Sequence, residues 1–129
     1  MDFKVLSHNL LRIVAGLMFW QHGAQKLFGW LGGNAVESWF AFPYGIAGIL
    51  EFFGGILILI GLKTRWVAFL LSGQMAYAYF TVHQPQGAMP IQNGGELAVL
   101  FCFIFLFLWS HGGGDWSVDG MMKKDDAAA

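Results

Sequence analysis

Arg12 and Glu51 are charged residues that each lie inside an otherwise apolar stretch of sequence. Of the 129 residues, 57% are hydrophobic and only 12% are charged. A soluble domain carries about twice that charged fraction. A charge deep in a bilayer costs roughly 2.5–3.5 kcal/mol on insertion scales, so such residues are usually kept for a function or a defined partner. The two residues therefore indicate an internal polar site that can bind a ligand or exchange protons.

Helical periodicity places these two charges on faces that also carry small residues. One face carries Arg12, Ala15, Gly16, Phe19, His22, Gly23 and Lys26, a second carries Gly48, Glu51, Gly54 and Gly55, and a third carries Gln74, Tyr77 and Thr81. Small residues let membrane helices approach closely, and polar residues belong where lipid is absent. We therefore predict that the first two faces pack together, with the long side chain of Arg12 able to reach Glu51.

The other polar residues gather towards one end of the apolar stretches, where they predict the mouth of a cavity that opens to the outer side. Glu96 directly precedes the last apolar run, so we expect it to turn towards the interior. Glu51 and Glu96 can exchange protons if burial raises their pKa values, and Arg12 would oppose that rise at Glu51. The candidate catalytic residues are Glu51, Arg12, Glu96 and His22, and the candidate cofactor-binding residues are Lys26, Tyr77, Asn93 and His83.

Several kinds of chemistry are disfavoured. His22, His83 and Glu96 match no metal-ligand spacing, so no metal is predicted. Cys102 is the only cysteine, which excludes an intramolecular disulfide and a CxxC motif, and any redox chemistry needs a bound cofactor or a partner's thiols. The net charge of −1 gives no case for nucleic acid. A structural alternative for Arg12 and Glu51 stays open, namely a buried ion pair that only fixes helix register.

Four helices must position these residues. Apolar stretches run over about 5–24, 41–62, 66–82 and 95–109, and about 20 residues of helix cross a bilayer core. The predicted fold is an all-α integral membrane four-helix bundle over residues 1–119. Asn34 is expected to cap a short helix over 35–42, and an irregular connection is expected over 82–95. Arg12 interrupts the first stretch, so we expect that stretch to be retained rather than cleaved as a signal peptide.

The distribution of lysine and arginine residues predicts the orientation of the chain in the membrane. Lys4, the pair Lys63 and Arg65, and the pair Lys123 and Lys124 fall on one side of a four-span topology, against Lys26 on the other. Positive residues favour the cytoplasm, so both termini are predicted to be cytoplasmic. The glycine- and aspartate-rich end, residues 120–129, is predicted to be a flexible cytoplasmic tail.

The chain resembles the DoxX family of membrane proteins over most of its length. The resemblance rests on four motifs in order: Arg12…Gly16…Phe19…His22-Gly23…Lys26-Leu27-Phe28-Gly29, then Glu51…Gly54-Gly55…Gly61-Leu62-x-Thr64-Arg65, then Asn93-Gly94-Gly95-Glu96, and Gly114-Asp115-Trp116-Ser117-Val118-Asp119. It implies a four-helix protein of the bacterial cytoplasmic membrane. It also implies a link to quinone-dependent thiosulfate oxidation or to thiol and oxidative-stress balance, with soluble redox enzymes as partners. The family's polar positions correspond to Arg12, His22, Lys26, Glu51, Asn93 and Glu96.

Three functions follow as hypotheses. The first is a quinone-binding membrane subunit of an oxidoreductase system that needs a soluble or membrane redox partner, in which His22, Lys26 or Tyr77 donates to a quinone carbonyl. The second is a non-enzymatic membrane anchor or assembly partner, in which Arg12 and Glu51 serve only the fold. The third is a small transporter, which would need a homo-oligomer because four helices are few for alternating access.

Overall fold

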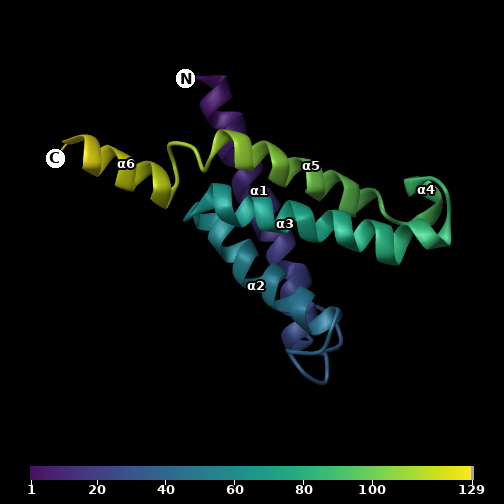
Figure 1. The fold of residues 1–129 in the computed structure, drawn as a ribbon. Helices are drawn as coiled ribbons and strands as arrows, with labels where there is room; N and C mark the ends of the chain where they lie inside the picture. The colour runs from purple at the N-terminus through teal and green to yellow at the C-terminus, as the bar shows by residue number, and fades with distance from the viewer. Residues whose placement is uncertain (129) are drawn as a thin grey trace.

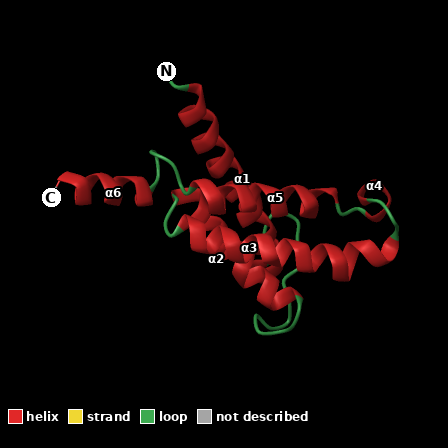
Figure 2. Cartoon of the chain, turned by 45° about the horizontal axis from the view of Figure 1, so that its top comes forward, coloured by secondary structure: helices red, strands yellow, loops and turns green. Residues whose placement is uncertain are grey.

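A computed structural model describes the backbone of residues 1–128 and the side chains of residues 1–125. This part of the chain is helical and contains no strand (Figures 1 and 2). The elements are α1 (Phe3–Phe28), α2 (Tyr44–Ile60), α3 (Thr64–Ala78), the π-helical turn η1 (Tyr79–His83), the 3-10 turn η2 (Gln84–Gln86), α4 (Pro90–Asn93), α5 (Glu96–His111) and α6 (Val118–Ala128). The four long helices α1, α2, α3 and α5 match the four predicted apolar stretches, so the all-α prediction is confirmed.

The long helices form two antiparallel pairs, α1 with α2 and α3 with α5. In Figure 1 the two pairs cross near the turn that joins α2 to α3. From there they diverge, so that the α1–α2 loop lies at the bottom of the view and α4 at the right. α6 extends away from both pairs, on the side where the chain begins and ends. This divergence leaves room between the far ends of the two pairs.

Glycines set the close approach of α1 to α2. A Cβ atom built on Gly23 would lie 2.2 Å from the backbone nitrogen of Phe52, and one on Gly16 would lie 2.5 Å from that of Leu59. A Cβ atom on Gly55 would likewise lie 2.6 Å from the nitrogen of Trp20. The two backbones are therefore in direct contact, as small residues allow. The prediction that these two helix faces pack together is confirmed.

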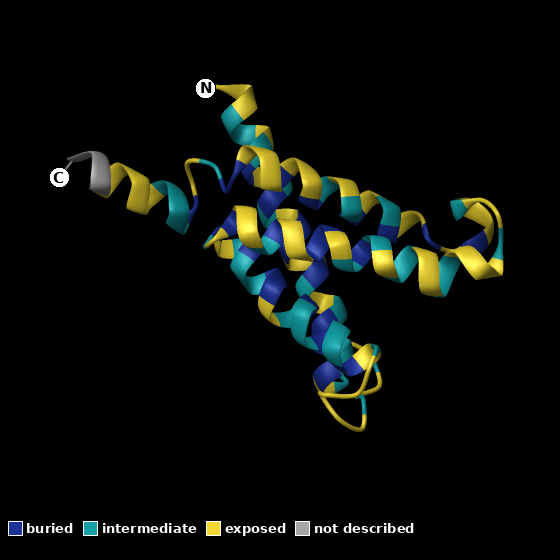
Figure 3. Cartoon of the chain, in the orientation of Figure 1, coloured by how far each residue is buried: buried dark blue, intermediate teal, exposed yellow. Residues whose placement is uncertain are grey.

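Aromatic and aliphatic side chains join the two pairs where they cross. The ring of Phe19 on α1 packs against Phe101 and Phe105 on α5, with ring centroids 5.2 Å and 4.9 Å away. Ile58 and Leu71 are fully buried in the same cluster. Figure 3 shows the buried residues along the inner faces of the helices and the exposed ones along the outer faces. The core therefore sits at the crossing, beside the faces that carry the polar residues.

Two connecting segments differ from the sequence predictions. The short helix predicted over 35–42 is absent, and this segment forms turns. It is held to the end of α1 by the Val36 amide, which donates to the Lys26 carbonyl at 2.8 Å, and by the Trp39 indole, which donates to the Leu27 carbonyl at 3.2 Å. These contacts to α1 take the place of helical hydrogen bonds.

The connection predicted to be irregular from residue 82 begins instead as a direct continuation of α3 through η1 and η2. Residues 120–128 lie in α6. Ser117 caps this helix, because its hydroxyl accepts from the Gly120 amide at 2.9 Å. The flexibility of the tail stays a prediction, and Ala129 lies outside the described residues.

Within residues 1–128, no helix combines the length and the apolar character needed to cross a membrane. The predicted stretches are thus confirmed as helices, while their place in a bilayer stays a prediction.

The glycine contacts make a test of the α1–α2 interface. Gly23→Ala should lower the free energy of unfolding by about 1–3 kcal/mol, because the new methyl group meets the backbone of Phe52 and forces a shift. Gly73→Ala on α3 is the matched control, since nothing lies within 4 Å of a Cβ atom there. It should be neutral or stabilising by up to about 1 kcal/mol, because alanine favours helix. Thermal unfolding of the purified proteins measures both, and equal stability of the two variants would contradict this packing.

Candidate functional site

Arg12 is fully buried, and within the described residues its guanidinium donates only to backbone carbonyls. Its Nε donates to Gly113 at 2.7 Å, Nη1 donates to Ile58 at 3.0 Å and to Leu59, and Nη2 donates to Trp116 at 3.1 Å. The α2 carbonyls belong to its last turn, where the helix dipole favours a cation. Arg12 thus ties α1 to the end of α2 and to the segment after α5. The expected reach of Arg12 to Glu51 is wrong, because its donors are used at the end of α2.

The segment after α5 is locked onto the same end of the molecule. The Asn9 side chain is buried, and its Oδ1 accepts from the Trp116 amide at 3.0 Å. The carboxylate of Asp119 accepts from the amides of Lys63 and Thr64, each at 2.8 Å, and so caps the start of α3. The motif over residues 114–119, which supported the family resemblance, therefore stabilises the fold.

Glu51 finds a different cation. It is only 3% exposed, and its Oε1 accepts from Lys26 Nζ at 2.6 Å. Among the side chains of residues 1–125 this is the only salt bridge. Its Oε2 accepts from Gln74 Nε2 on α3 at 3.1 Å. An ionised carboxylate can only accept, so the Gln74 amide nitrogen must face Glu51. The Gln74 Oε1 atom is then buried without a hydrogen-bond partner among the described residues.

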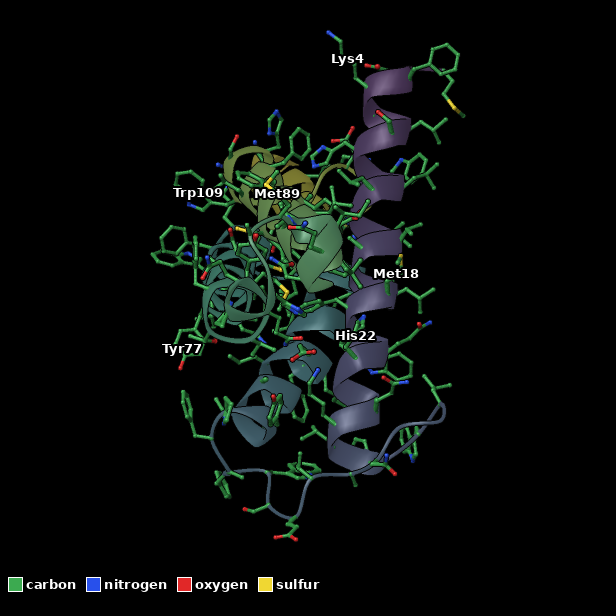
Figure 4. All side chains as sticks on the ribbon, turned by 90° about the vertical axis from the view of Figure 1, so that its right-hand side faces the viewer. Lys4, Met18, His22, Tyr77, Met89 and Trp109 are labelled. Carbon is green, nitrogen blue, oxygen red and sulfur yellow. The ribbon has the colours of Figure 1, made fainter. Side chains whose placement is uncertain are left out.

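This three-residue network borders a cavity of about 380 Å³ between the diverging helix pairs. Apolar walls come from both pairs and include Phe19, Met75 and Phe101. Figure 4 labels His22 on α1 and Tyr77, which comes from α3. The polar residues along the cavity are His22, Lys26, Tyr44, Glu51, Gln74, Tyr77, Thr81 and His83. The cavity falls in the size range of small-molecule sites, which are mostly apolar with a few placed polar groups.

The structure brings five of the eight predicted site residues together at this cavity, namely His22, Lys26, Glu51, Tyr77 and His83. Arg12 lies instead at the end of α2. Asn93 is buried but holds the turn before α5: its Nδ2 donates to Tyr79 Oη at 3.2 Å and to the Gly87 carbonyl at 3.1 Å.

Glu96 is exposed in the first turn of α5, so the expectation that it faces the interior is wrong. A carboxylate in the first turn is favourable because it lies at the positive end of the helix dipole. Burial inside the molecule is not needed to explain its position.

Gln74 is the residue that the predicted site lacked. Its spacing with Tyr77 and Thr81 placed it on a polar face of α3, which was the available signal. The sequence could not show that this face meets Glu51, because the contact depends on how α3 packs against α2.

The fold and site define a small all-helical protein in which two helix pairs enclose an apolar cavity with a buried ionic network at its side. The sequence profile of the DoxX family matches residues 8–84, and the chain belongs to the DoxX family.

The chain is similar to two proteins of Haemophilus influenzae, each described as "Uncharacterized protein". One is 42% identical, covering 88% of this chain and 89% of its own length, and the other is 26% identical, covering 92% and 85%. It is also 37% identical to the Bacillus subtilis protein described as "Putative oxidoreductase CatD", over 57% of each chain. No solved structure matches the chain.

The hydrogen bonds of Arg12 predict that a positive charge alone at this position is not enough to stabilise the fold. Arg12→Lys should lower the free energy of unfolding by about 3 kcal/mol or more, because one ammonium group cannot serve carbonyls on both α2 and the segment after α5. Arg65→Lys is the matched control, since that exposed side chain donates only to the Ser110 carbonyl, and it should change stability by less than about 0.5 kcal/mol. Thermal unfolding and cellular accumulation report the difference.

Exchanging the charges of Arg12 and Glu51 distinguishes the observed separate partners from a direct ion pair between the two residues. Arg12→Glu combined with Glu51→Arg should accumulate no better than Arg12→Glu alone, because each residue has its own separate partners. Recovery of accumulation in the double variant would mean that the two side chains pair directly.

Proposed function

We propose that this chain is a membrane-embedded subunit of a quinone-linked redox system, and that the cavity beside Glu51 receives the quinone head group. The single observation that carries the proposal is the Lys26–Glu51–Gln74 network on an otherwise apolar cavity. Membership of the DoxX family supports a redox role, and so does the description "Putative oxidoreductase CatD" of the Bacillus subtilis relative. The proposed location is the bacterial cytoplasmic membrane, as a multi-pass protein with both termini in the cytoplasm.

Apolar side chains on the outer surface support the membrane location. Large ones are strongly exposed on the paired helices and beyond them, for example Phe69 on α3, Phe80 in η1, and Leu100 and Phe103 on α5. Monomeric soluble proteins rarely expose contiguous apolar patches of more than a few hundred Å². The helical path from Thr64 also runs without a break through η1 and η2 to Gln86, which extends the reach of α3 beyond its α-helical part. We therefore propose lipid as the partner of these faces.

The residues around the cavity fit a quinone head. A quinone carbonyl is an acceptor, and Lys26 Nζ, the His22 ring and the Tyr77 hydroxyl are among the donors that line the cavity. The hydroxyl of the reduced form is a donor, and Gln74 Oε1 is a buried acceptor that has no partner in the part of the chain that the structure describes. The flat ring finds aromatic surface on Phe19 and Phe101, which stand in the cavity wall. Donors and an acceptor are thus both present for the two redox forms.

When bound, the quinone supplies the electron-accepting group that the protein itself lacks. Glu51 is the carboxylate best placed to hold a proton near the head group, and Lys26 fixes its position through the 2.6 Å contact. The electrons come from a redox partner, since Cys102 is the only thiol in the chain. Arg12, Asn93 and Glu96 have no direct role in this proposal, because none of them lines the cavity.

A non-enzymatic anchoring role is the second candidate, and the burial of Arg12 favours it. All of its hydrogen bonds serve the fold, which is what the anchoring hypothesis expects of an intramembrane charge. The two proposals differ at the cavity, because an anchor does not need Gln74 or Tyr77 to be polar.

Quinone retention tests the proposed function. Protein purified in mild detergent should carry quinone, detected by mass spectrometry of an organic extract. Gln74→Leu and Tyr77→Phe should each reduce the retained amount, with a loss of affinity of about threefold to tenfold for one hydrogen bond. Tyr77→Phe removes only a hydroxyl that makes no hydrogen bond within the described residues, so it should fold normally.

Gln21→Leu is the matched control for Gln74→Leu, since Gln21 is exposed on α1 and does not line the cavity. It should retain quinone as the unmodified protein does. Equal retention by all three variants would locate the quinone elsewhere. Absence of quinone from every preparation, with no response to added quinone analogues, would reject the redox proposal in favour of an anchor.

A further inference from the structure

A second cavity lies at the opposite end of the molecule from the Glu51 network. Its volume is about 640 Å³, and it is bounded by the α2–α3 turn, the end of α5 and the first turns of α6. Its charged or hydroxyl-bearing wall residues include Lys63, Thr64, Arg65, Asp119, Lys123 and Lys124. These residues come from two parts of the chain that are far apart in sequence, and Asp119 joins them by capping α3.

The balance of charge around this cavity is positive. Four cations line it, namely Lys63, Arg65, Lys123 and Lys124, against the two carboxylates of Asp115 and Asp119. Both oxygens of Asp119 already accept from backbone amides at the start of α3. Among the side chains of residues 1–125, none of the four cations forms a salt bridge. Four cations that share one cavity repel one another and favour an anion between them.

Thr64 is a second, independent sign of a ligand. Thr64 is one of the residues that line this cavity, its side chain is fully buried, and its Oγ1 atom has no hydrogen-bond partner among the described residues. A buried hydroxyl without a partner costs free energy, so such groups in native proteins usually have an explanation. A hydroxyl can donate to an anionic oxygen, and it stands between Lys63 and Arg65 in the chain.

We infer that this cavity binds the phosphate group of an anionic ligand. A phosphate offers several acceptor oxygens, which suits lysine and arginine donors together with one hydroxyl. A membrane phospholipid and a free phosphorylated solute share this chemistry. The lipid source is favoured by Trp66, which also lines the cavity and is 81% exposed, because tryptophan prefers the membrane–water interface. The site is separate from the cavity proposed for quinone and does not depend on it.

Lipid binding to the full-length protein in neutral detergent tests the inference, with native mass spectrometry as the readout. Phosphatidylglycerol should bind in preference to phosphatidylcholine, which carries no net charge. Lys123→Gln combined with Lys124→Gln should weaken phosphatidylglycerol binding about tenfold, because two charge-assisted contacts are lost. The two lysines are exposed, so the fold should survive. Lys4→Gln is the control, since Lys4 is an exposed cation outside the cavity.

A second experiment, with inorganic phosphate, distinguishes a membrane phospholipid from a free phosphorylated solute as the ligand. If the ligand is a free phosphorylated solute, inorganic phosphate should raise the melting temperature of the unmodified protein more than chloride does at equal ionic strength, both in buffer without sulfate. The protein should then show no preference for phosphatidylglycerol over phosphatidylcholine. Either source supports a phosphate site. An equal loss of lipid binding in Lys4→Gln and in the double variant would show general charge attraction and overturn the site, as would binding of neither probe.

Thr64→Val adds a readout that a purely structural role would not give. Removal of an unpaired buried hydroxyl should leave the protein as stable as before, or more stable, when no phosphate is present. It should weaken binding of whichever probe the unmodified protein prefers by roughly threefold to tenfold. Unchanged binding in Thr64→Val would remove Thr64 from the site, and unchanged binding in the double lysine variant as well would overturn the proposal.

Discussion

The buried guanidinium of Arg12 is the interaction on which the arrangement of the helices depends. A charge removed from water is tolerated only when its donors are used, and here backbone carbonyls of α2 and of the segment after α5 accept from it. Those carbonyls lie far apart in the sequence, so the side chain joins three segments at one point. The hydrogen bond from the Trp116 amide to Asn9 and the cap that Asp119 makes on α3 lie around the same point. One end of the molecule is thereby fixed.

Because Arg12 is used at that end, Glu51 needs another cation, and α1 supplies Lys26 from the same face. The two cations are separated by roughly 21 Å along the helix at 1.5 Å per residue. One helix face therefore serves two different purposes. Its first half holds the fold through backbone carbonyls, and its second half presents an ionic network to a cavity. The chemistry proposed for the quinone belongs where the helix pairs diverge, because there the ionic network of Glu51 lies next to open space.

The same division explains the character of the two cavities. The cavity beside Glu51 is mainly apolar with a few buried polar groups, as sites for ring-shaped organic ligands are. The cavity near α6 is bordered by four cations and two carboxylates, and none of the four cations forms a salt bridge with a side chain of residues 1–125, which suits an anion. In the proposed membrane orientation the second cavity faces the cytoplasm. A quinone site and a phosphate site would then lie at opposite ends of one small bundle.

The sequence by itself determined the four long helices, the α1–α2 contact through small residues and most of the cavity's polar residues, because these follow from periodicity within one helix. It also singled out Arg12 and Glu51 as buried charges. Only the tertiary structure decided their partners. Lys26 and Arg12 lie on the same face of α1, so spacing alone could not tell which of them meets Glu51. The roles of Gln74, Asp119 and the lysines of α6 likewise depend on contacts between segments far apart in the chain, and such contacts have no period in the sequence.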